Sequence, residues 1–296
     1  MIDIVVGPNL VEFGNFVMSW HGFFSFIAVS SSVYLVARWA PMSGIDPDDI
    51  YSLAVWCIIG GIIGARAVHV IDHWGDPYTF SDPVRMIAIW SGGIGVWGGI
   101  LGGLAGGVLG ARRLELPVGT VADLVAPVLL FAQTVGRLGD IVNGEHCAKA
   151  WDFALGFVWT NPDSTARMCG PINGNGVGVS VHPIIAYEMI WNMLALVVVW
   201  RLWGKLQPPG MVYVLYLTLY SVGRFWITFL RDDKIMAIGL QEAQFISMIV
   251  LAIAVPLLII KARFVSGSRL LAVDFQAPLS VSERRTRAQR RRKRRR

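Results

Sequence analysis

The sequence predicts an all-α integral membrane protein with about seven transmembrane helices. Of its 296 residues, 54% are hydrophobic and only 16% are charged, and the mean hydropathy is +0.55. This composition excludes an ordinary soluble enzyme. A bilayer core about 30 Å thick requires roughly 20 apolar residues in each spanning helix. Seven stretches meet this requirement, at about 16–37, 52–72, 86–110, 118–137, 183–203, 211–230 and 241–262.

Basic residues predict the orientation of these helices. Residues 284–296 hold ten Lys and Arg and no acid, and they create the net charge of +6. Positive residues favour the cytoplasmic side, so we expect a cytoplasmic C-terminus and, with an odd number of helices, an N-terminus outside. The first 15 residues lack the basic region of a signal peptide, which predicts that the first helix stays in the mature protein.

The basic tail, residues 264–296, is expected to be disordered and to bind anionic lipids of the inner leaflet. A nucleic-acid-binding arm is the alternative interpretation, and in a polytopic membrane protein we favour the lipid. Residues 1–263 are then the membrane domain. Its longest connection, residues 139–182 between the fourth and fifth helices, is predicted to be external and to form a small lid.

Two local patterns leave alternatives open. Glycines recur every four residues in the third span, and this spacing predicts a groove for a close-packed helix. The tract 90–99 could instead begin as non-helical backbone that enters a cavity. The three cysteines have no metal-type spacing. Cys147 and Cys169 share the external loop, and a disulfide between them is a hypothesis.

Polar residues gather at the predicted external ends of the spans. The block 136–145 places an arginine, two carboxylates and an amide behind an apolar segment, where an unpaired charge costs several kcal/mol. Arg137 and Arg224 could clamp a lipid phosphate, because guanidinium matches phosphate in a bidentate way. The alternative is a structural ion pair of Arg137 with Asp140 or Glu145. We interpret residues 231–233 as solvated interfacial charges.

The block Gly136–Glu145, which reads GRLGDIVNGE, closely resembles the signature of prolipoprotein diacylglyceryl transferases. Weaker matches follow the same order along most of residues 15–262. They are Trp20-His21-Gly22, Gly64-Ala65-Arg66, the glycine tract with Gly98 and Gly99, Asp123 with Ala126-Pro127, His182-Pro183 with Tyr187-Glu188, Gly223-Arg224-Phe225, and Gln244.

The resemblance implies a seven-helix enzyme of the bacterial inner membrane whose site faces the outer side. Such enzymes transfer the diacylglyceryl group of phosphatidylglycerol to the lipobox cysteine thiol of a preprolipoprotein; a thioether forms and glycerol phosphate leaves. No metal or organic cofactor is implied. The resemblance, taken together with the departures from it described next, suggests as catalytic residues His21, Asp140, Glu145 and Arg224. The suggested substrate-binding residues are Arg137, Asn143, Gly98, Gly99, Arg66 and Tyr187.

Thiolate is the nucleophile in this reaction, so a base must remove the proton of the thiol. The chain departs from the family pattern at positions that could supply this base. Trp97 stands where the family has His or Tyr, His21 replaces a Tyr, Asp140 an Asn, and Thr228 a Glu. We hypothesise that the base has moved to His21, with Asp140 supplying the charge lost at position 228. The alternative is a paralogue on the same scaffold that binds or moves phospholipid without thiol transfer.

Overall fold

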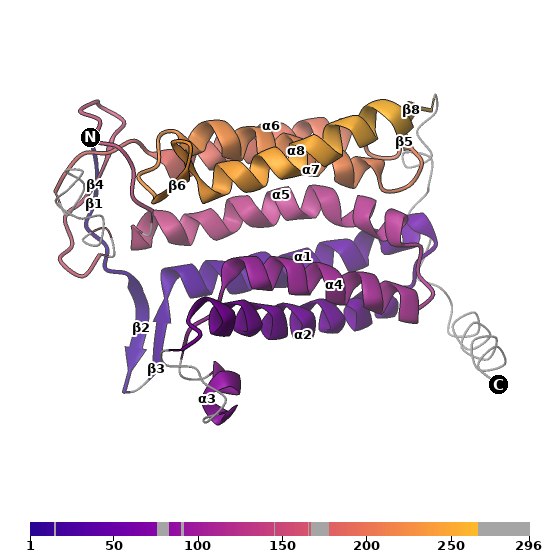
Figure 1. The fold of residues 1–296 in the computed structure, drawn as a ribbon, viewed down its shortest axis with the longest axis horizontal. Coiled ribbons are helices and arrows are strands. Elements are labelled where there is room, and N and C mark those ends of the chain that lie inside the picture. The colour runs from indigo at the N-terminus through magenta and orange to yellow at the C-terminus, as the bar shows by residue number, and fades with distance from the viewer. Residues whose placement is uncertain are drawn as a thin grey trace. The chain divides into compact units, whose positions relative to one another are not determined.

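A computed structural model describes residues 1–14, 16–75, 83–89, 92–144, 146–164, 166 and 178–265. Long helices stand at all seven places that the sequence predicts (Figure 1). They are α1 (Trp20–Trp39), α2 (Pro47–Asp72), α4 (Val96–Arg113), α5 (Val118–Asn143), α6 (Ile184–Leu202), α7 (Met211–Thr228) and α8 (Glu242–Lys261). A 3-10 helix, η1 (Ala40–Ser43), and the short helix α3 (Pro83–Ile87) lie between them in the chain.

Among the described residues, five segments are long and apolar enough to cross a membrane: Trp20–Ser43, Pro47–Asp72, Val118–Asn143, Ile184–Leu202 and Glu242–Lys261. The chain is therefore a multi-pass membrane protein. Helices α4 and α7 have 18 residues each. They are not among these five segments; α4 is rich in glycine and ends on Arg112 and Arg113, and α7 carries tyrosines and Arg224. The number of seven spans stays a prediction.

Short strands outside the long helices make the all-α prediction incomplete. They form four two-stranded sheets in the described part of the chain. The strand β1 (Ile2–Ile4) pairs in parallel with β4 (Phe157–Trp159). The other pairs are antiparallel: β2 (Asn9–Phe13) with β3 (Phe16–Ser19), β5 (Leu206–Gln207) with β8 (Arg263–Phe264), and β6 (Ile235–Ala237) with β7 (Leu240–Gln241).

Several predicted boundaries are wrong, and the second span begins at Pro47 rather than at about 52. The first span begins at Trp20 rather than 16, because residues 16–19 form β3. The third begins at Val96 rather than 86, since Gly92 and Gly93 adopt φ of 82° and 78°, which a right-handed helix excludes. The non-helical start of the glycine tract is thus confirmed for residues 92–95, and residues 90 and 91 lie outside the described residues.

The helix α5 is longer than predicted, and this changes the site. It continues to Asn143, and the connection to α6 begins at Gly144, not at 139. Gly144 has a φ of 66° and ends the helix. Gly139 permits a close approach of α1, because a Cβ on it would meet the backbone of His21. Most of the signature block is therefore helical.

The chain divides into two compact units. Of the described residues, the first comprises those within 1–35 and 122–265, and the second those within 36–121. In the first unit, α6, α7 and α8 pack in sequence order beside α5 (Figure 1). One core joins α5, α6 and α7 around Leu130, Val199 and Val212. A second core, which includes Phe157, Trp159 and Val181, gives the connection after α5 a packed interior.

One carboxylate sets the start of α7 within this unit. Asp123 of α5 accepts hydrogen bonds from the backbone N–H groups of Gly210 (2.7 Å) and Tyr213 (3.0 Å). These groups belong to the first turn of α7, whose N–H groups have no partner within the helix. Asp123 thereby caps α7 from a neighbouring helix and sets the helix that carries Arg224.

In the second unit, α2 and α4 pack through glycines. A Cβ on Gly64 would collide with the backbone of Gly98 and Gly102, and one on Gly60 with that of Gly102 and Gly106. The helices can approach this closely only because neither side has a Cβ. The close-packed groove predicted from the glycine spacing is confirmed.

Gly64→Ala is expected to lower the free energy of unfolding by about 1–3 kcal/mol, because the added methyl group must push two backbones apart. Gly61→Ala is a matched control on the same helix, since its Cβ would lie at an ordinary 3.5 Å from Gly99 O. Denaturant titration in mixed micelles measures both variants. Equal stability of the two would contradict the packing argument.

Candidate functional site

Charged residues from three helices meet at one end of the first unit. Arg137 and Asp140 lie in the last two turns of α5, and Arg224 lies in the last turn and a half of α7. Glu188 is the fifth residue of α6. Arg137, Glu188 and Arg224 lie outside the terminal turns of their helices, where the helix dipole acts. The packing of the three helices, not the helix ends, therefore brings these charges together.

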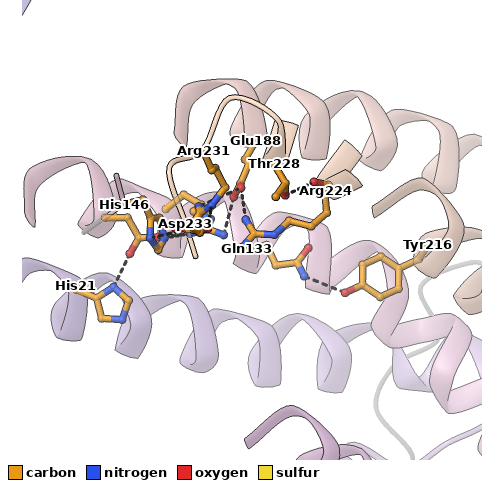
Figure 2. A network of polar contacts seen from close by, with 11 residues as sticks. His21, Gln133, His146, Glu188, Tyr216, Arg224, Thr228, Arg231 and Asp233 are labelled. Carbon is orange, nitrogen blue, oxygen red and sulfur yellow. Dashed lines mark hydrogen bonds and ion pairs between the residues drawn. The ribbon is translucent and has the colours of Figure 1, made fainter. Parts of the chain in front are cut away.

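Glu188 is the hub of this polar centre (Figure 2). Its side chain is only 7% exposed. Its Oε2 lies 2.6 Å from Nη2 of Arg137, and its Oε1 contacts Nη1 of Arg224 and lies 3.8 Å from Nη1 of Arg231. Breaking a buried ion pair by removing one partner leaves an uncompensated charge. Glu188 therefore holds the arginines of α5 and α7 together.

Asp140 links the arginine cluster to α1. One oxygen lies 2.6 Å from Nδ1 of His21, and the other lies 2.6 Å from Nη1 of Arg137. The Asp140 side chain is 5% exposed and that of His21 is 46% exposed. A buried carboxylate thus holds a half-exposed imidazole, an arrangement that orients a general base. The placement of His21 beside Asp140 agrees with the relocated-base hypothesis, which stays untested.

The pairing of Arg137 resolves one alternative. The predicted ion pair with Asp140 is present, and Arg137 also contacts Glu188. Glu145, the other suggested partner and a suggested catalytic residue, lies outside the described residues. The structural pair and the arginine clamp are therefore compatible, because the two guanidinium groups converge on one carboxylate while Asp140 orients the first.

The interpretation of Arg231 as an interfacial charge is wrong. The residue is only 5% exposed. Its Nε donates to Asp233 at 2.6 Å, and its backbone oxygen accepts a hydrogen bond from Gln241 at 3.0 Å. Arg231 follows Arg224 by seven residues, which correspond to two helical turns. Residues at this spacing lie on the same side of a helix, so the sequence indicated that both could reach the same centre.

His146 and the role of Glu188 were also missed by the sequence reasoning. Nε2 of His146 lies 2.5 Å from Nη1 of Arg137, and Nδ1 lies 3.4 Å from Nη2 of Arg231. The imidazole thus stands between two guanidinium groups. His146 follows the signature block directly, and Glu188 is a charge inside a predicted span; that intramembrane charge was a signal for function.

The remaining suggested site residues have other surroundings. Asn143 is 4% exposed at the end of α5. Tyr187 faces the ring of His182 at a centroid distance of 6.3 Å, and His182 stacks on Trp151 at 4.5 Å. Burial, with a contribution from Lys149, lowers the pKa of His182 below its ordinary value. Cys147 is disulfide-bonded and Cys57 is free, while Cys169 lies outside the described residues.

Arg66, Gly98 and Gly99 belong to the second unit. The guanidinium of Arg66 donates to the backbone oxygens of Arg85, Met86, Gly92 and Gly93 at 2.6–3.0 Å. Arg66 thus ties the non-helical tract before α4 to α2. Gly98 makes room for α2, because a Cβ on it would collide with the backbone of Gly64, whereas a Cβ on Gly99 would lie at an ordinary 3.6 Å from Ala65 Cβ. The substrate-binding role of Arg66, Gly98 and Gly99 stays a prediction.

The polar centre combines anion-binding and proton-accepting groups. Three guanidinium groups face the buried carboxylates of Asp140 and Glu188, and Arg231 also pairs with the more exposed Asp233. Guanidinium groups gathered in this way can bind an oxyanion through charge-assisted hydrogen bonds. The imidazole of His21 borders the same residues. In the described ranges no group of three or more His, Cys, Asp or Glu side chains is arranged to hold a metal ion.

Comparison with known proteins shows a similarity over nearly the whole helical region. The family model described as prolipoprotein diacylglyceryl transferase matches residues 8–260. The phosphatidylglycerol–prolipoprotein diacylglyceryl transferase of Synechococcus elongatus is 36% identical over 259 residues, which cover 84% of this chain and 85% of that protein. The enzymes of the same name from Trichormus variabilis (32%, covering 82% and 85%) and Dehalococcoides mccartyi (31%, covering 89% and 96%) are also similar.

Proposed function

This chain belongs to the prolipoprotein diacylglyceryl transferase family, and from that premise we propose that it transfers the diacylglyceryl group of phosphatidylglycerol to the lipobox cysteine of a preprolipoprotein. The observation that carries the proposal is the convergence of Arg137 and Arg224 on the buried Glu188. Two preorganised guanidinium groups at the end of membrane helices suit the phosphate of a lipid whose acyl chains stay in the bilayer.

In the proposed reaction the arginines hold the phosphoglycerol group. The cysteine thiol loses its proton, and the thiolate attacks the diacylglyceryl carbon that carries the phosphate ester oxygen. A carbon–sulfur bond forms and the carbon–oxygen bond breaks, and its electron pair leaves with glycerol phosphate. Because the nucleophile and the leaving group are held in one site, the reaction becomes effectively intramolecular.

We propose His21 as the base that accepts the thiol proton. Asp140 supports this role because its carboxylate lies 2.6 Å from Nδ1 of His21 and is itself buried. A carboxylate so placed orients the imidazole and stabilises its protonated form, and positioned bases of this kind typically contribute about 10²–10⁴-fold to the rate. Asn143 and Glu145 are proposed to orient the head group, and Tyr187, Arg66, Gly98 and Gly99 to line its approach.

We further propose seven spans in the bacterial inner membrane, with the polar centre toward the outer face. The basic tail supports a cytoplasmic C-terminus, where it would meet anionic lipids. The N-terminus then lies outside. The connection after α5, which has its own packed core around Trp159, is proposed to act as a small external lid.

Incubation of the purified full chain with phosphatidylglycerol and a lipobox peptide tests the function. The expected products are a thioether-linked diacylglyceryl peptide, detected by mass spectrometry, and an equal amount of glycerol phosphate. A peptide with serine in place of the lipobox cysteine is the control and should give neither product. Retained phosphatidylglycerol binding without either product would refute transfer and would favour a lipid-binding paralogue.

A further inference from the structure

One buried guanidinium nitrogen of Arg231 makes no hydrogen bond to the part of the chain that the structure describes. Nε and Nη2 of Arg231 lie 2.6 and 3.3 Å from the two oxygens of Asp233, and Nη2 also lies 3.4 Å from His146. Nη1 is buried and makes no hydrogen bond within the described ranges. The guanidinium plane is thus held by two of its nitrogens while the third is directed toward the polar centre (Figure 2).

The carboxylates of the centre are already engaged by other arginines. Glu188 Oε2 is 2.6 Å from Arg137, and Oε1 contacts Arg224. Nη1 of Arg231 lies 3.8 Å from the same Oε1, which is too long for a hydrogen bond. The closer partner of Arg231, Asp233, is 36% exposed and binds through the other nitrogens. A buried donor left unpaired destabilises the fold, so this N–H is preorganised for a ligand.

We propose that Nη1 of Arg231 donates a hydrogen bond to the phosphate of the departing glycerol phosphate, so that Arg231 is a catalytic residue that stabilises the leaving group. The inference rests on the proposed function. The phosphodiester of phosphatidylglycerol carries one negative charge. When the thiolate displaces it, the carbon–oxygen electron pair stays on the phosphate, and glycerol phosphate carries two charges.

The increase from one to two negative charges on the phosphate determines the step at which Arg231 acts. The phosphodiester of the substrate carries a single charge, and Arg137 and Arg224 are each already shared with Glu188. The second negative charge appears only as the carbon–oxygen bond breaks. A donor that binds this developing charge more strongly than the ground state accelerates the chemical step instead of tightening substrate binding.

Steady-state kinetics of Arg231→Gln with phosphatidylglycerol vesicles and a lipobox peptide test the proposal. We expect kcat to fall about 10²-fold, the effect typical of removing one preorganised donor, with KM for phosphatidylglycerol within about threefold of the parent chain. We also expect glycerol phosphate to inhibit the variant about tenfold more weakly. A kcat within threefold of the parent, or a rise in KM alone, would overturn the inference.

Two further variants separate catalysis from structure. Arg231→Ala should regain activity when millimolar guanidinium is added, whereas a residue that only braces the fold would show no rescue. Lys234→Gln removes an exposed cation three residues away and should leave kcat unchanged. An equal loss in this control would attribute the effect of Arg231 to general charge and refute a specific contact.

The proposal can still be tested if the Arg231→Gln variant does not fold. If Arg231→Gln does not yield folded protein, Arg231→Lys keeps the charge but loses the planar fork, and we expect an intermediate loss of about tenfold in kcat; no loss would overturn the inference. An active parent chain with an equally active Arg231 variant refutes only the role of Arg231. A parent chain that forms no thioether refutes the proposed function.

Discussion

Glu188→Gln is expected to abolish transferase activity and to lower the free energy of unfolding by about 3–5 kcal/mol, the cost of breaking a buried ion pair by removing one partner. Glutamine keeps the shape of glutamate but removes the charge that Arg137 and Arg224 share. The guanidinium groups would then repel each other around a neutral amide. They would no longer be held where a phosphate must bind.

Thermal and denaturant unfolding in mixed micelles, with product formation measured in parallel, checks this expectation. Glu242→Gln is the matched control, because Glu242 is an exposed glutamate in the first turn of α8. Its loss should cost at most about 1 kcal/mol through the helix dipole and should spare activity. Wild-type stability and activity of Glu188→Gln would show that Arg137 and Arg224 do not depend on the shared carboxylate.

His21→Ala is expected to lower kcat about 10³-fold, in the middle of the range for a positioned general base, while the protein stays folded. The side chain is 46% exposed, so its removal leaves little buried space. Asp140 keeps its ion pair with Arg137 in the variant. Phosphatidylglycerol binding should therefore be retained, because the arginine cluster is intact.

The measurement is thioether formation at saturating peptide, together with phosphatidylglycerol binding to the same preparation. His73→Ala removes an exposed histidine at the end of α2 and should leave kcat unchanged. Added imidazole is expected to restore part of the activity of His21→Ala. Full activity of His21→Ala without imidazole would mean that another group accepts the thiol proton.

Hydropathy predicted the long helices well because each must supply its own row of apolar side chains to the lipid. It failed at boundaries that depend on backbone conformation. The third span begins at Val96 because glycines at 92 and 93 adopt positive φ, and composition cannot reveal φ. Hydropathy also did not predict the extension of α5 to Asn143, because the polar residues after position 137 end the apolar run while the backbone stays helical.

The candidate site was predicted in part. The residues Arg137, Asp140 and Arg224 were identified because charge in an apolar segment is costly, and the structure brings them together around Glu188. Arg231 and His146 were missed because both follow the ends of helices, where charged residues usually face water. Only the packing of the chain after α5 and α7 buries Arg231 and leaves the side chain of His146 22% exposed.

The sequence by itself indicated that this chain spans a membrane, that the glycines of the third span form a groove for a close-packed helix, and that the signature block resembles that of the transferase family. These properties are local: they depend on composition, on spacing along one helix, or on a short motif. The tertiary structure alone decided which charges share a partner. Glu188, Asp140 and three arginines come from segments up to about 90 residues apart, and a buried charge is stabilised by whichever partner the fold brings within about 4 Å.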